Sequence, residues 1–438
     1  MGIYSDLLDK KHPLAVIGLG YVGLPLALAL AGRLRVIGFD TNPLRIADLQ
    51  QGVDRSGELE EGLLHQALNG QRDISFTSDC QALSQASFFI IAVPTPVDPY
   101  NQPQLDHLRH ASALVGAGLT AGDYVVFEST VFPGCTEEEC LPILEKESGL
   151  RAGRGFKYGY SPERINPGDK EHTLTNTVKI ISACDHKALH TLHKVYSLVV
   201  QAPLYHAPSI RVAEAAKIIE NTQRDVNIAL INELSIVLGR MGINTYDVLQ
   251  AAATKWNFTP FSPGLVGGHC VGVDPYYLVY KAHELNYHPR IIHAGRVVND
   301  AMGAYIGKKV AKRIVALGKA LSHARVLVLG ITFKENVADI RNSKVVDIIR
   351  ELTDFGLSVD VADPYASPQE VQRVYKLSLI EPQAGAQVYD AIILAVPHQP
   401  YLSLHESDFL ALAPAPAIFA DLKGLFRSRI HSLEYWSL

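Results

Sequence analysis

Apolar residues along the chain fall into runs that predict alternating buried strands and helices. Short, nearly continuous apolar runs stand at 14–17, 35–39, 87–93 and 123–128, and a helical apolar segment at 24–31 separates the first two. Such continuous runs are typical of parallel strands that helices cover on both faces. The first part of the chain is therefore predicted to be a doubly wound α/β unit.

The remaining pattern predicts two further parts. Residues 209–240 repeat apolar positions at helical spacing without a proline, over a length unusual for a globular helix. The C-terminal third returns to strands at 325–331, 357–363 and 389–397, with a helix at 342–355. The expected fold is α/β, with two Rossmann-like doubly wound parallel-sheet lobes joined by a long-helix middle domain. The predicted domains are 1–205, 206–305 and 306–438.

The first strand runs directly into a glycine turn, Gly18-Leu-Gly20-Tyr-Val-Gly23, and the second strand ends on Asp40. A strand, glycine turn, helix, strand and acidic residue in this order predict a dinucleotide site. Asp40 favours NAD over NADP because a carboxylate repels a 2′-phosphate, although Arg45 could serve such a phosphate. The C-terminal lobe echoes 86–94 at 389–397 but lacks the GxGxxG turn, so it is a candidate for binding a different ligand.

Length, charge and cysteine content narrow the class of protein. The 438 residues carry a net charge of −5 and no long basic run, so nucleic acid is not an expected partner. The longest apolar runs are of strand length, which predicts no membrane span. Five irregularly spaced cysteines and scattered histidines predict reduced thiols in the cytoplasm and no metal site.

Residues 267–275, Gly-Gly-His-Cys-Val-Gly-Val-Asp-Pro, place Cys270 ahead of an expected helix start at Asp274-Pro275. The positive end of a helix dipole favours the thiolate, and glycines let the backbone approach a ligand. At a nicotinamide site, a thiol can trap an aldehyde as a hemithioacetal, which is again a hydride donor. Such a cysteine would carry an alcohol through to an acid. The alternative is a buried, inert cysteine in a glycine turn.

Five ordered segments resemble the nucleotide-sugar 6-dehydrogenases, the family of UDP-glucose, UDP-N-acetylhexosamine and GDP-mannose dehydrogenases. They are GLGYVGLP at 18–25, PTP at 94–96, EAAKIIEN at 214–221, GGHCVGVDP at 267–275 and GITFKENVADIRNS at 330–343. The resemblance spans nearly the whole chain. It implies oxidation of a sugar C6 alcohol to a uronic acid with two NAD in succession.

The resemblance also implies catalytic roles. Cys270 is the nucleophile, and Lys217 and Asn221, spaced i and i+4 on one helix face, stabilise the alkoxide. Asp274 orients water or shuttles a proton, Glu163 is the base in thioester hydrolysis, and Thr130 positions the water.

Further residues are implied as ligands, although Lys217, Lys334 and Arg341 could be solvated charges, and Glu163 could form a plain surface ion pair with Arg164. The implied cofactor ligands are Gly18, Gly20, Tyr21, Val22, Gly23, Asp40, Arg45, Pro94, Thr95, Ser129, Thr130 and Arg341. The implied UDP-sugar ligands are Glu163, Arg164, Asn166, Lys217, Asn221, Phe261, Gly267 and Lys334.

The segment 163–168 resembles the UDP-N-acetylhexosamine branch of the family, and the segments 165–172 and 255–258 most resemble the UDP-N-acetylglucosamine and UDP-N-acetylgalactosamine enzymes of capsule and O-antigen synthesis. We expect UDP-N-acetylglucosamine as the substrate, with the galactosamine and mannosamine epimers or UDP-glucose as alternatives. Two other classes remain: a two-electron dehydrogenase, and a catalytically silent protein that binds NAD or a nucleotide sugar in regulation. The long helix predicts a homodimer built on the middle domain.

Overall fold

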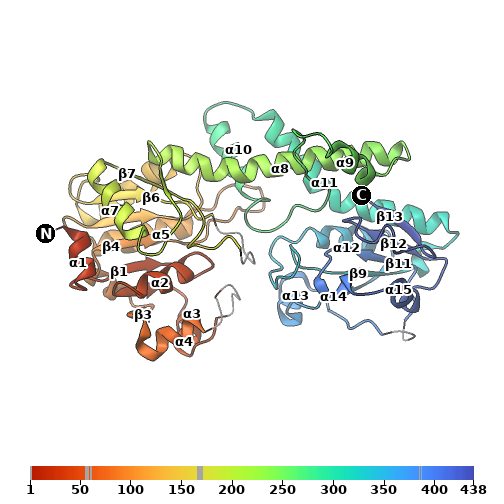
Figure 1. Ribbon diagram of the computed structural model, residues 1–438, viewed down its shortest axis with the longest axis horizontal. Helices are drawn as coiled ribbons and strands as arrows, with labels where there is room; N and C mark the ends of the chain where they lie inside the picture. Colours follow the sequence, from red (N-terminus) through yellow and green to blue (C-terminus); the bar gives the residue numbers. More distant parts are fainter. Residues whose placement is uncertain (1, 55–58, 60–61, 165–170, 384, 386) are drawn as a thin grey trace. The chain divides into compact units, whose positions relative to one another are not determined.

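The computed structural model describes residues 2–54, 59, 62–164, 171–383, 385 and 387–438, and it divides into two compact units (Figure 1). Unit 1 comprises residues 1–220 and 276–287, and unit 2 comprises residues 221–275 and 288–438. Helices α8 (Ile210–Arg240) and α10 (Asp274–Glu284) have residues in both units. The predicted boundaries after residues 205 and 305 stay a prediction.

Unit 1 contains the N-terminal sheet, whose order among the described residues is β3-β2-β1-β4-β5-β6-β7-β8. All its pairs are parallel, as predicted, except that β7 runs antiparallel to β6. Its elements are α1 (Ile3–Leu8), β1 (Leu14–Ile17), α2 (Gly23–Ala31), β2 (Val36–Phe39), α3 (Pro43–Gln50), α4 (Leu63–Gln66), β3 (Ile74–Thr77), β4 (Phe88–Ile91), α5 (Asp106–Gly118), β5 (Tyr124–Phe127), α6 (Leu141–Ser148), β6 (Lys157–Tyr160), β7 (Lys179–Ala183), α7 (His186–Tyr196) and β8 (Leu204–His206).

The continuous apolar runs form strands because helices cover both faces of this sheet. Leu14 and Val16 point into a core shared with α2 and α7, whereas Ala15 and Ile17 point to the other face. All four side chains are buried. The predicted doubly wound unit is therefore confirmed, and the ends of the predicted strands lie within two residues of the expected ones.

Unit 2 contains a second, wholly parallel sheet in the order β10-β9-β11-β12-β13 among the described residues. Its elements are α9 (Thr245–Ala252), α11 (Arg290–Ala316), β9 (Arg325–Leu329), α12 (Val345–Asp354), β10 (Ser358–Ala362), α13 (Pro368–Tyr375), β11 (Ala391–Leu394), α14 (Gln399–Leu402), α15 (Glu406–Leu412), β12 (Ile418–Asp421) and β13 (Glu434–Ser437). The two faces of β9 again contribute to two separate cores. The predicted second lobe is thus confirmed.

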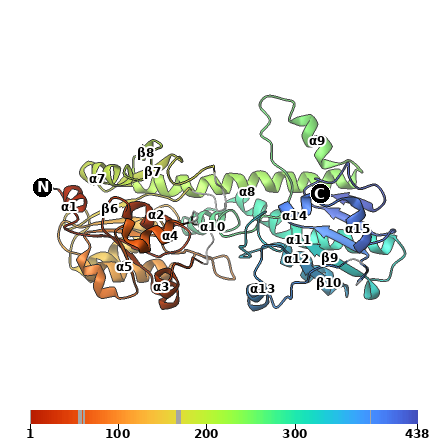
Figure 2. The same cartoon turned by 60° about the horizontal axis from the view of Figure 1, so that its bottom comes forward.

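The long helix begins one residue after the predicted start and runs for 31 residues as α8 (Figure 2). Within unit 2 it is fixed to α11 by a buried ion pair, in which Arg296 Nη1 lies 2.6 Å from Asp225 Oδ1. Asn299 Nδ2 donates to the same carboxylate oxygen at 2.7 Å. Along the described residues, no helix has the length and apolar character needed to cross a membrane.

Candidate active site

The glycine turn after β1 has the geometry of a pyrophosphate-binding turn. Gly18 has a φ of +91°, and a Cβ there would lie 2.7 Å from the Ala92 carbonyl oxygen. A Cβ on Gly23 would lie 1.8 Å from the Gly18 carbonyl oxygen, so only glycine lets α2 begin this close to β1. A Cβ on Gly20 would meet nothing within 4 Å, which leaves that position open. These environments match the three glycine roles in dinucleotide turns, and NAD fits them.

Asp40, at the end of β2, is bound to the turn. Its Oδ2 accepts the Leu19 backbone N–H and its Oδ1 accepts the Asn42 backbone N–H, both at 2.9 Å. Each oxygen keeps a lone pair for a ribose hydroxyl. Arg45 forms an ion pair with Asp54 at 2.8 Å and donates to the Leu19 carbonyl oxygen. Because Arg45 is held in this way, the structure favours NAD more clearly than the sequence does.

The loops after β4 and β5 are tied together. Thr95 Oγ1 donates to the Thr130 carbonyl oxygen, and Ser129 Oγ donates to the Val93 carbonyl oxygen, both at 2.7 Å. These predicted residues share the sheet edge near β1 and β4, where the strand order reverses and where ligands bind in such folds. Of the other predicted cofactor ligands, Tyr21 and Val22 are half-buried and Pro94 is exposed.

Glu163 follows β6 and lies in a charged cluster of unit 1. Its Oε1 accepts the Arg164 backbone N–H at 2.7 Å, and its Oε2 lies 3.7 Å from Lys179 Nζ. The Arg164 guanidinium instead pairs with Glu220 at 2.7 Å. The interpretation of Glu163 and Arg164 as a plain surface ion pair is therefore wrong. Asn166 lies outside the described residues.

Helix α8 carries Lys217 and Asn221 four residues apart, which places them on one helix face. Lys217 is 8 % exposed, so its interpretation as a solvated surface charge is wrong. Asn221 Nδ2 donates to Asp274 Oδ2 at 2.5 Å, and both side chains are buried. This hydrogen bond fixes an amide and a carboxylate at the start of α10.

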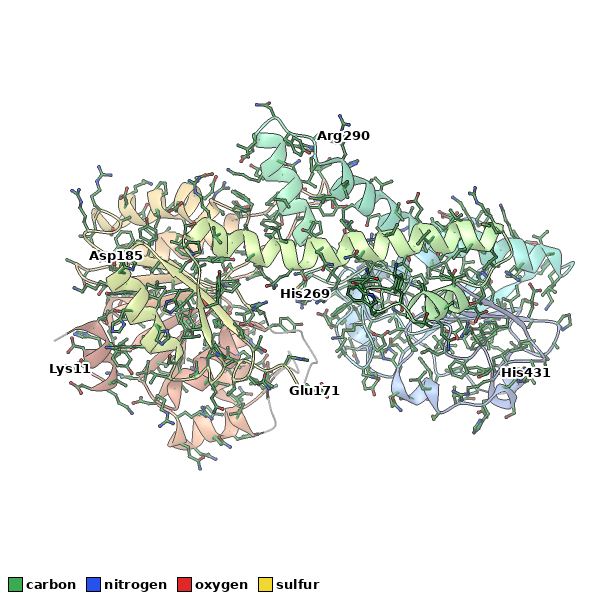
Figure 3. The ribbon with its side chains drawn as sticks, turned by 45° about the horizontal axis from the view of Figure 1, so that its top comes forward. Lys11, Glu171, Asp185, His269, Arg290 and His431 are labelled. Atoms are coloured by element: carbon green, nitrogen blue, oxygen red, sulfur yellow. The ribbon has the colours of Figure 1, made fainter. Side chains whose placement is uncertain are left out.

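Cys270 stands in the loop before α10, which Figure 3 labels at His269. The Cys270 carbonyl oxygen accepts the backbone N–H of Val273 at 3.0 Å and that of Asp274 at 2.8 Å. Helix α10 begins at Asp274, where the sequence predicts a helix start, and the turn that leads into it begins earlier, at Cys270. The cysteine is half-buried rather than fully buried, which argues against an inert core residue.

The glycines of this loop pack against the segment after β9, within unit 2. A Cβ on Gly267 would lie 2.5 Å from the Asn342 carbonyl oxygen, and the Gly268 N–H donates to that oxygen at 3.3 Å. Asn232 holds the preceding residues, because its side chain exchanges hydrogen bonds of 2.8 and 2.9 Å with the backbone of Gly264. The loop that carries Cys270 is thus fixed from two sides.

The remaining predicted ligands lie in unit 2. Arg341 Nη2 is 2.7 Å from Asp339 Oδ2 and 3.2 Å from His269 Nδ1, so its guanidinium lies beside the residue that precedes Cys270. Lys334 is half-buried, and its carbonyl oxygen accepts from Thr332 Oγ1 at 2.9 Å. Phe261 is also half-buried. Their roles as ligands stay predictions.

Sequence reasoning missed a buried pair in the C-terminal lobe. His398 Nε2 lies 3.0 Å from Asp363 Oδ2, and both side chains are fully buried. The Asn336 backbone N–H donates to His398 Nδ1 at 2.9 Å, which leaves the imidazole proton on Nε2. Burial opposes the charge of Asp363, yet His398 outweighs this and holds the pKa of the carboxyl below its ordinary value. The signal was the echo of 92–94 at 395–397, which puts His398 where the first lobe has Thr95.

Unit 1 by itself defines a class. A parallel sheet with this glycine turn and a carboxylate at the end of β2 is the NAD-binding half of a dehydrogenase. Family models agree along the chain: the NAD binding domain of the UDP-glucose/GDP-mannose dehydrogenase family matches 12–200, its central domain 211–301 and its UDP binding domain 327–428. The chain belongs to this family. It is an NAD-dependent nucleotide-sugar dehydrogenase with a UDP binding domain.

Individual relatives are similar over nearly the whole chain. The UDP-N-acetyl-D-glucosamine 6-dehydrogenase of Pseudomonas aeruginosa is 50 % identical over 95 % of this chain and 97 % of its own length. An enzyme of the same name from Salmonella typhi is 48 % identical over 94 % and 95 %. Among solved structures, the UDP-D-ManNAc dehydrogenase of Pyrococcus horikoshii matches with a TM-score of 0.88 at 27 % identity, covering 97 % of this chain and 98 % of its own.

Proposed function

We propose that the chain oxidises the C6 alcohol of UDP-N-acetylglucosamine to the uronic acid, through a thiohemiacetal and a thioester on Cys270. The observation that carries this proposal is the buried hydrogen bond between Asn221 and Asp274, beside the helical turn that begins at Cys270. The product keeps its UDP leaving group. It is therefore a glycosyl donor, suited to the synthesis of a surface polysaccharide such as capsule or O-antigen.

The proposed chemistry balances over two hydride transfers and one water. NAD⁺ held by the 18–23 turn and Asp40 would supply the hydride acceptor for each oxidation. Loss of a hydride and a proton turns the alcohol into an aldehyde, and the Cys270 sulfur adds to its carbonyl carbon to give a thiohemiacetal. Loss of a second hydride and proton from this adduct gives a thioester. Water then adds, the C–S bond breaks, and the uronic acid and the Cys270 thiol are released.

Each proposed role follows from what the residue can donate or accept. Lys217 and the second amide N–H of Asn221 stabilise the oxyanion of the Cys270 adduct. Losing one such donor typically costs about 10²–10³ in rate. Asp274 holds the Asn221 amide and accepts a proton, and Glu163 takes a proton from the water that Thr130 orients.

The choice of sugar is supported by the two relatives at 50 % and 48 % identity, both named UDP-N-acetyl-D-glucosamine 6-dehydrogenases. A site that pairs the N-acetyl amide rejects sugars without it, because its own buried polar groups are then left unpaired. We expect kcat/KM for UDP-N-acetylglucosamine to exceed that for UDP-glucose at least about tenfold, or about 1.4 kcal/mol of transition-state binding.

The test is the molar ratio of NADH formed to sugar nucleotide consumed, measured in parallel with UDP-N-acetylglucosamine, its galactosamine and mannosamine epimers and UDP-glucose. We expect a ratio of two. A ratio of one indicates a two-electron dehydrogenase, and zero indicates a regulatory binding protein. Cys270→Ser should abolish uronate formation, whereas Cys80→Ser, at an exposed cysteine, should not. Wild-type turnover by Cys270→Ser contradicts the mechanism.

We also infer a homodimer built on the helical middle of the chain. Leu230, Leu234 and Val237 are 53 %, 39 % and 47 % exposed, and their spacing puts them on one face of α8. An apolar face of this kind is typical of a protein–protein contact, and a stable one buries at least about 1,000 Å². Light scattering at micromolar concentration should give a dimer for the wild type and for Leu44→Glu, but a monomer for Leu234→Glu. A monomeric wild type contradicts the inference.

A further inference from the structure

Lys179 is a buried cation for which neither the motifs nor the proposed mechanism has a use. It is the first residue of β7 and is only 3 % exposed. Its Nζ lies 3.1 Å from Glu128 Oε2 and 3.7 Å from Glu163 Oε2, and it also donates to the Pro162 carbonyl oxygen at 3.3 Å. One ammonium group is thus shared by two carboxylates, and one of these is the proposed base.

Glu128 holds the other side of the ammonium group. It is fully buried, and the Tyr196 hydroxyl donates to its Oε1 at 2.5 Å. Burial raises the pKa of Tyr196 well above its ordinary value, so the phenol remains a donor. Burial opposes the charge of Lys179, but Glu128 and Glu163 outweigh this and its pKa stands above the ordinary value. Lys179 therefore stays a cation.

This cluster joins the two strand ends that carry the proposed hydrolytic groups. Glu128 precedes Ser129 and Thr130 at the end of β5, and Glu163 follows the end of the adjacent parallel strand β6. On Glu163, Oε1 is held by the Arg164 N–H and Oε2 faces the ammonium group. Lys179 thus restrains the Glu163 carboxylate at Oε2, whereas the Arg164 N–H binds Oε1.

A stabilising role alone would not require this arrangement. A buried ion pair often contributes no more to stability than apolar residues of equal volume, because desolvation offsets the attraction. The pair of Lys179 and Glu128 would already satisfy both charges. A purely structural ion pair does not explain why a second carboxylate, that of Glu163, also lies beside Lys179, with its side chain 12 % exposed.

We propose that Lys179 is a positioning residue that orients the Glu163 carboxylate toward the water that hydrolyses the Cys270 thioester. Glu128 and Tyr196 hold Lys179 in place for this task. The proposal rests on the proposed function, and it concerns only the hydrolytic half of the reaction. Loss of Lys179 should therefore slow the release of uronate and leave the two oxidations intact.

The experiment compares Lys179→Met, Lys179→Arg and Tyr196→Phe with the wild type in a rapid-mixing assay with UDP-N-acetylglucosamine and NAD⁺. In Lys179→Met we expect a burst of two NADH per site, a kcat lower by about 10²-fold, a KM for the sugar within about twofold, and an acyl adduct on Cys270 by mass spectrometry. Lys179→Arg should recover part of kcat, and Tyr196→Phe should lower it by a smaller factor. Glu163→Gln supplies the reference adduct.

Lys157→Met is the matched control, because Lys157 also pairs with a carboxylate in unit 1, Asp185 at 2.6 Å, but at the surface. It should leave kcat and the adduct unchanged. A folded Lys179→Met that hydrolyses at the wild-type rate, or that loses both NADH-forming steps without an adduct, overturns the proposal. If Lys179→Met does not fold, the Arg and Phe variants decide, and the absence of any adduct in both overturns it. A wild type that forms only one NADH overturns the proposed function itself.

Discussion

The two sheet lobes begin with the same arrangement of strand, glycine and acidic residue, but the carboxylates of Asp40 and Asp363 then have different surroundings. In each lobe the first strand ends at a glycine with a left-handed φ, +91° at Gly18 and +92° at Gly330. In each, the acidic residue after the second strand accepts the backbone N–H of the residue following that glycine. The distance is 2.9 Å to Asp40 and 2.6 Å to Asp363. The two strand frameworks are therefore equivalent up to this point.

The difference lies in the segment after the glycine. In unit 1, α2 begins at Gly23, five positions on, and Asp40 is only half-buried, so it remains accessible to a ribose. In unit 2, an irregular segment of residues 331–344 precedes α12, and Asp363 is taken by His398. The equivalent carboxylate stays accessible in one lobe, where we propose that it binds the ribose, and in the other it binds His398, which holds the Lys334 segment. Ligand choice is set after the strand, not by it.

The largest effect is expected from a substitution that disrupts the glycine turn at 18–23. Gly23→Ala places a Cβ 1.8 Å from a backbone oxygen, so we expect no detectable NAD binding and a loss of about 4 kcal/mol or more in stability. Gly20→Ala meets nothing within 4 Å in the protein. It should keep the thermal unfolding temperature and still weaken NAD binding, because its methyl group enters the space open to the cofactor.

The matching change in the other lobe is Gly330→Ala, whose Cβ would lie 2.5 Å from the Val396 Cβ. Calorimetry and NAD titration of the three variants check the comparison. The C-terminal variant should lose stability while its NAD affinity stays at the wild-type value. Equal NAD affinity in Gly20→Ala and the wild type would contradict the assignment of that position to the cofactor.

The second prediction removes the side chain of His398, which binds Asp363 and the Asn336 N–H in the C-terminal lobe. His398→Ala removes the imidazole that donates to the buried Asp363 carboxylate and leaves the Asn336 N–H without this acceptor, at a cost of about 3 kcal/mol. Because these contacts hold the segment with Lys334, KM for the UDP-sugar should rise while NAD affinity does not. Urea unfolding measures the loss of stability, and steady-state kinetics measure KM. An unchanged KM would show that the contacts of His398 do not affect substrate binding.

The sequence predicted what depends on local spacing. The turn at 18–23, Asp40 and the helix that follows Cys270 each leave a pattern within a few dozen residues, because strand, turn and helix each impose a fixed spacing. The strands β1, β2, β4 and β5 and the length of α8 could all be inferred in this way. The antiparallel β7 could not, because a short apolar strand carries no mark of its direction.

The missed groups depend on contacts between distant positions. Lys179 and Glu128 are 51 residues apart, and Asp363 and His398 are 35 apart. The sequence around a charged residue in a strand is the same whether or not the fold places an oppositely charged side chain next to it. The partner is brought near only by the fold, so the sequence gives no signal for Lys179 beyond its place in a mostly apolar strand.

The third prediction contrasts two buried carboxylates. Glu214 accepts the backbone N–H groups of Gly134 and Thr136, whereas Asp363 also accepts from the His398 imidazole, and burial raises the pKa of Glu214 to about 7. Below pH 4.5 it is protonated in both the folded and unfolded states, and above pH 7 it is ionised in both. Folding then has to bury a charge, so stability is lost as pH rises between these values, by up to about 3 kcal/mol.

Urea unfolding at pH 5 and pH 8 tests this contrast. The stability of Glu214→Gln relative to the wild type should improve as pH rises, whatever its value at pH 5. Glu284→Gln is the control, because Lys281 holds the pKa of Glu284 below its ordinary value and the group is ionised in both states over this range. A flat difference for Glu214→Gln between the two pH values would show that the buried carboxylate does not titrate there.

The smallest effect is expected for Asp40, and it tests whether Asp40 and Asp363 have different roles. Asp40→Ala removes the repulsion of a 2′-phosphate, so the preference for NAD over NADP in kcat/KM should fall by about tenfold, or about 1.4 kcal/mol. Arg45 remains tied to Asp54 at 2.8 Å, which limits the gain in NADP use. Adding Asp54→Ala releases this guanidinium and should raise NADP use further.

Asp363→Asn, the equivalent change in the other lobe, should leave the cofactor ratio unchanged. A wild type that prefers NADP contradicts the role given to Asp40, and an altered ratio in Asp363→Asn contradicts the division of labour between the lobes.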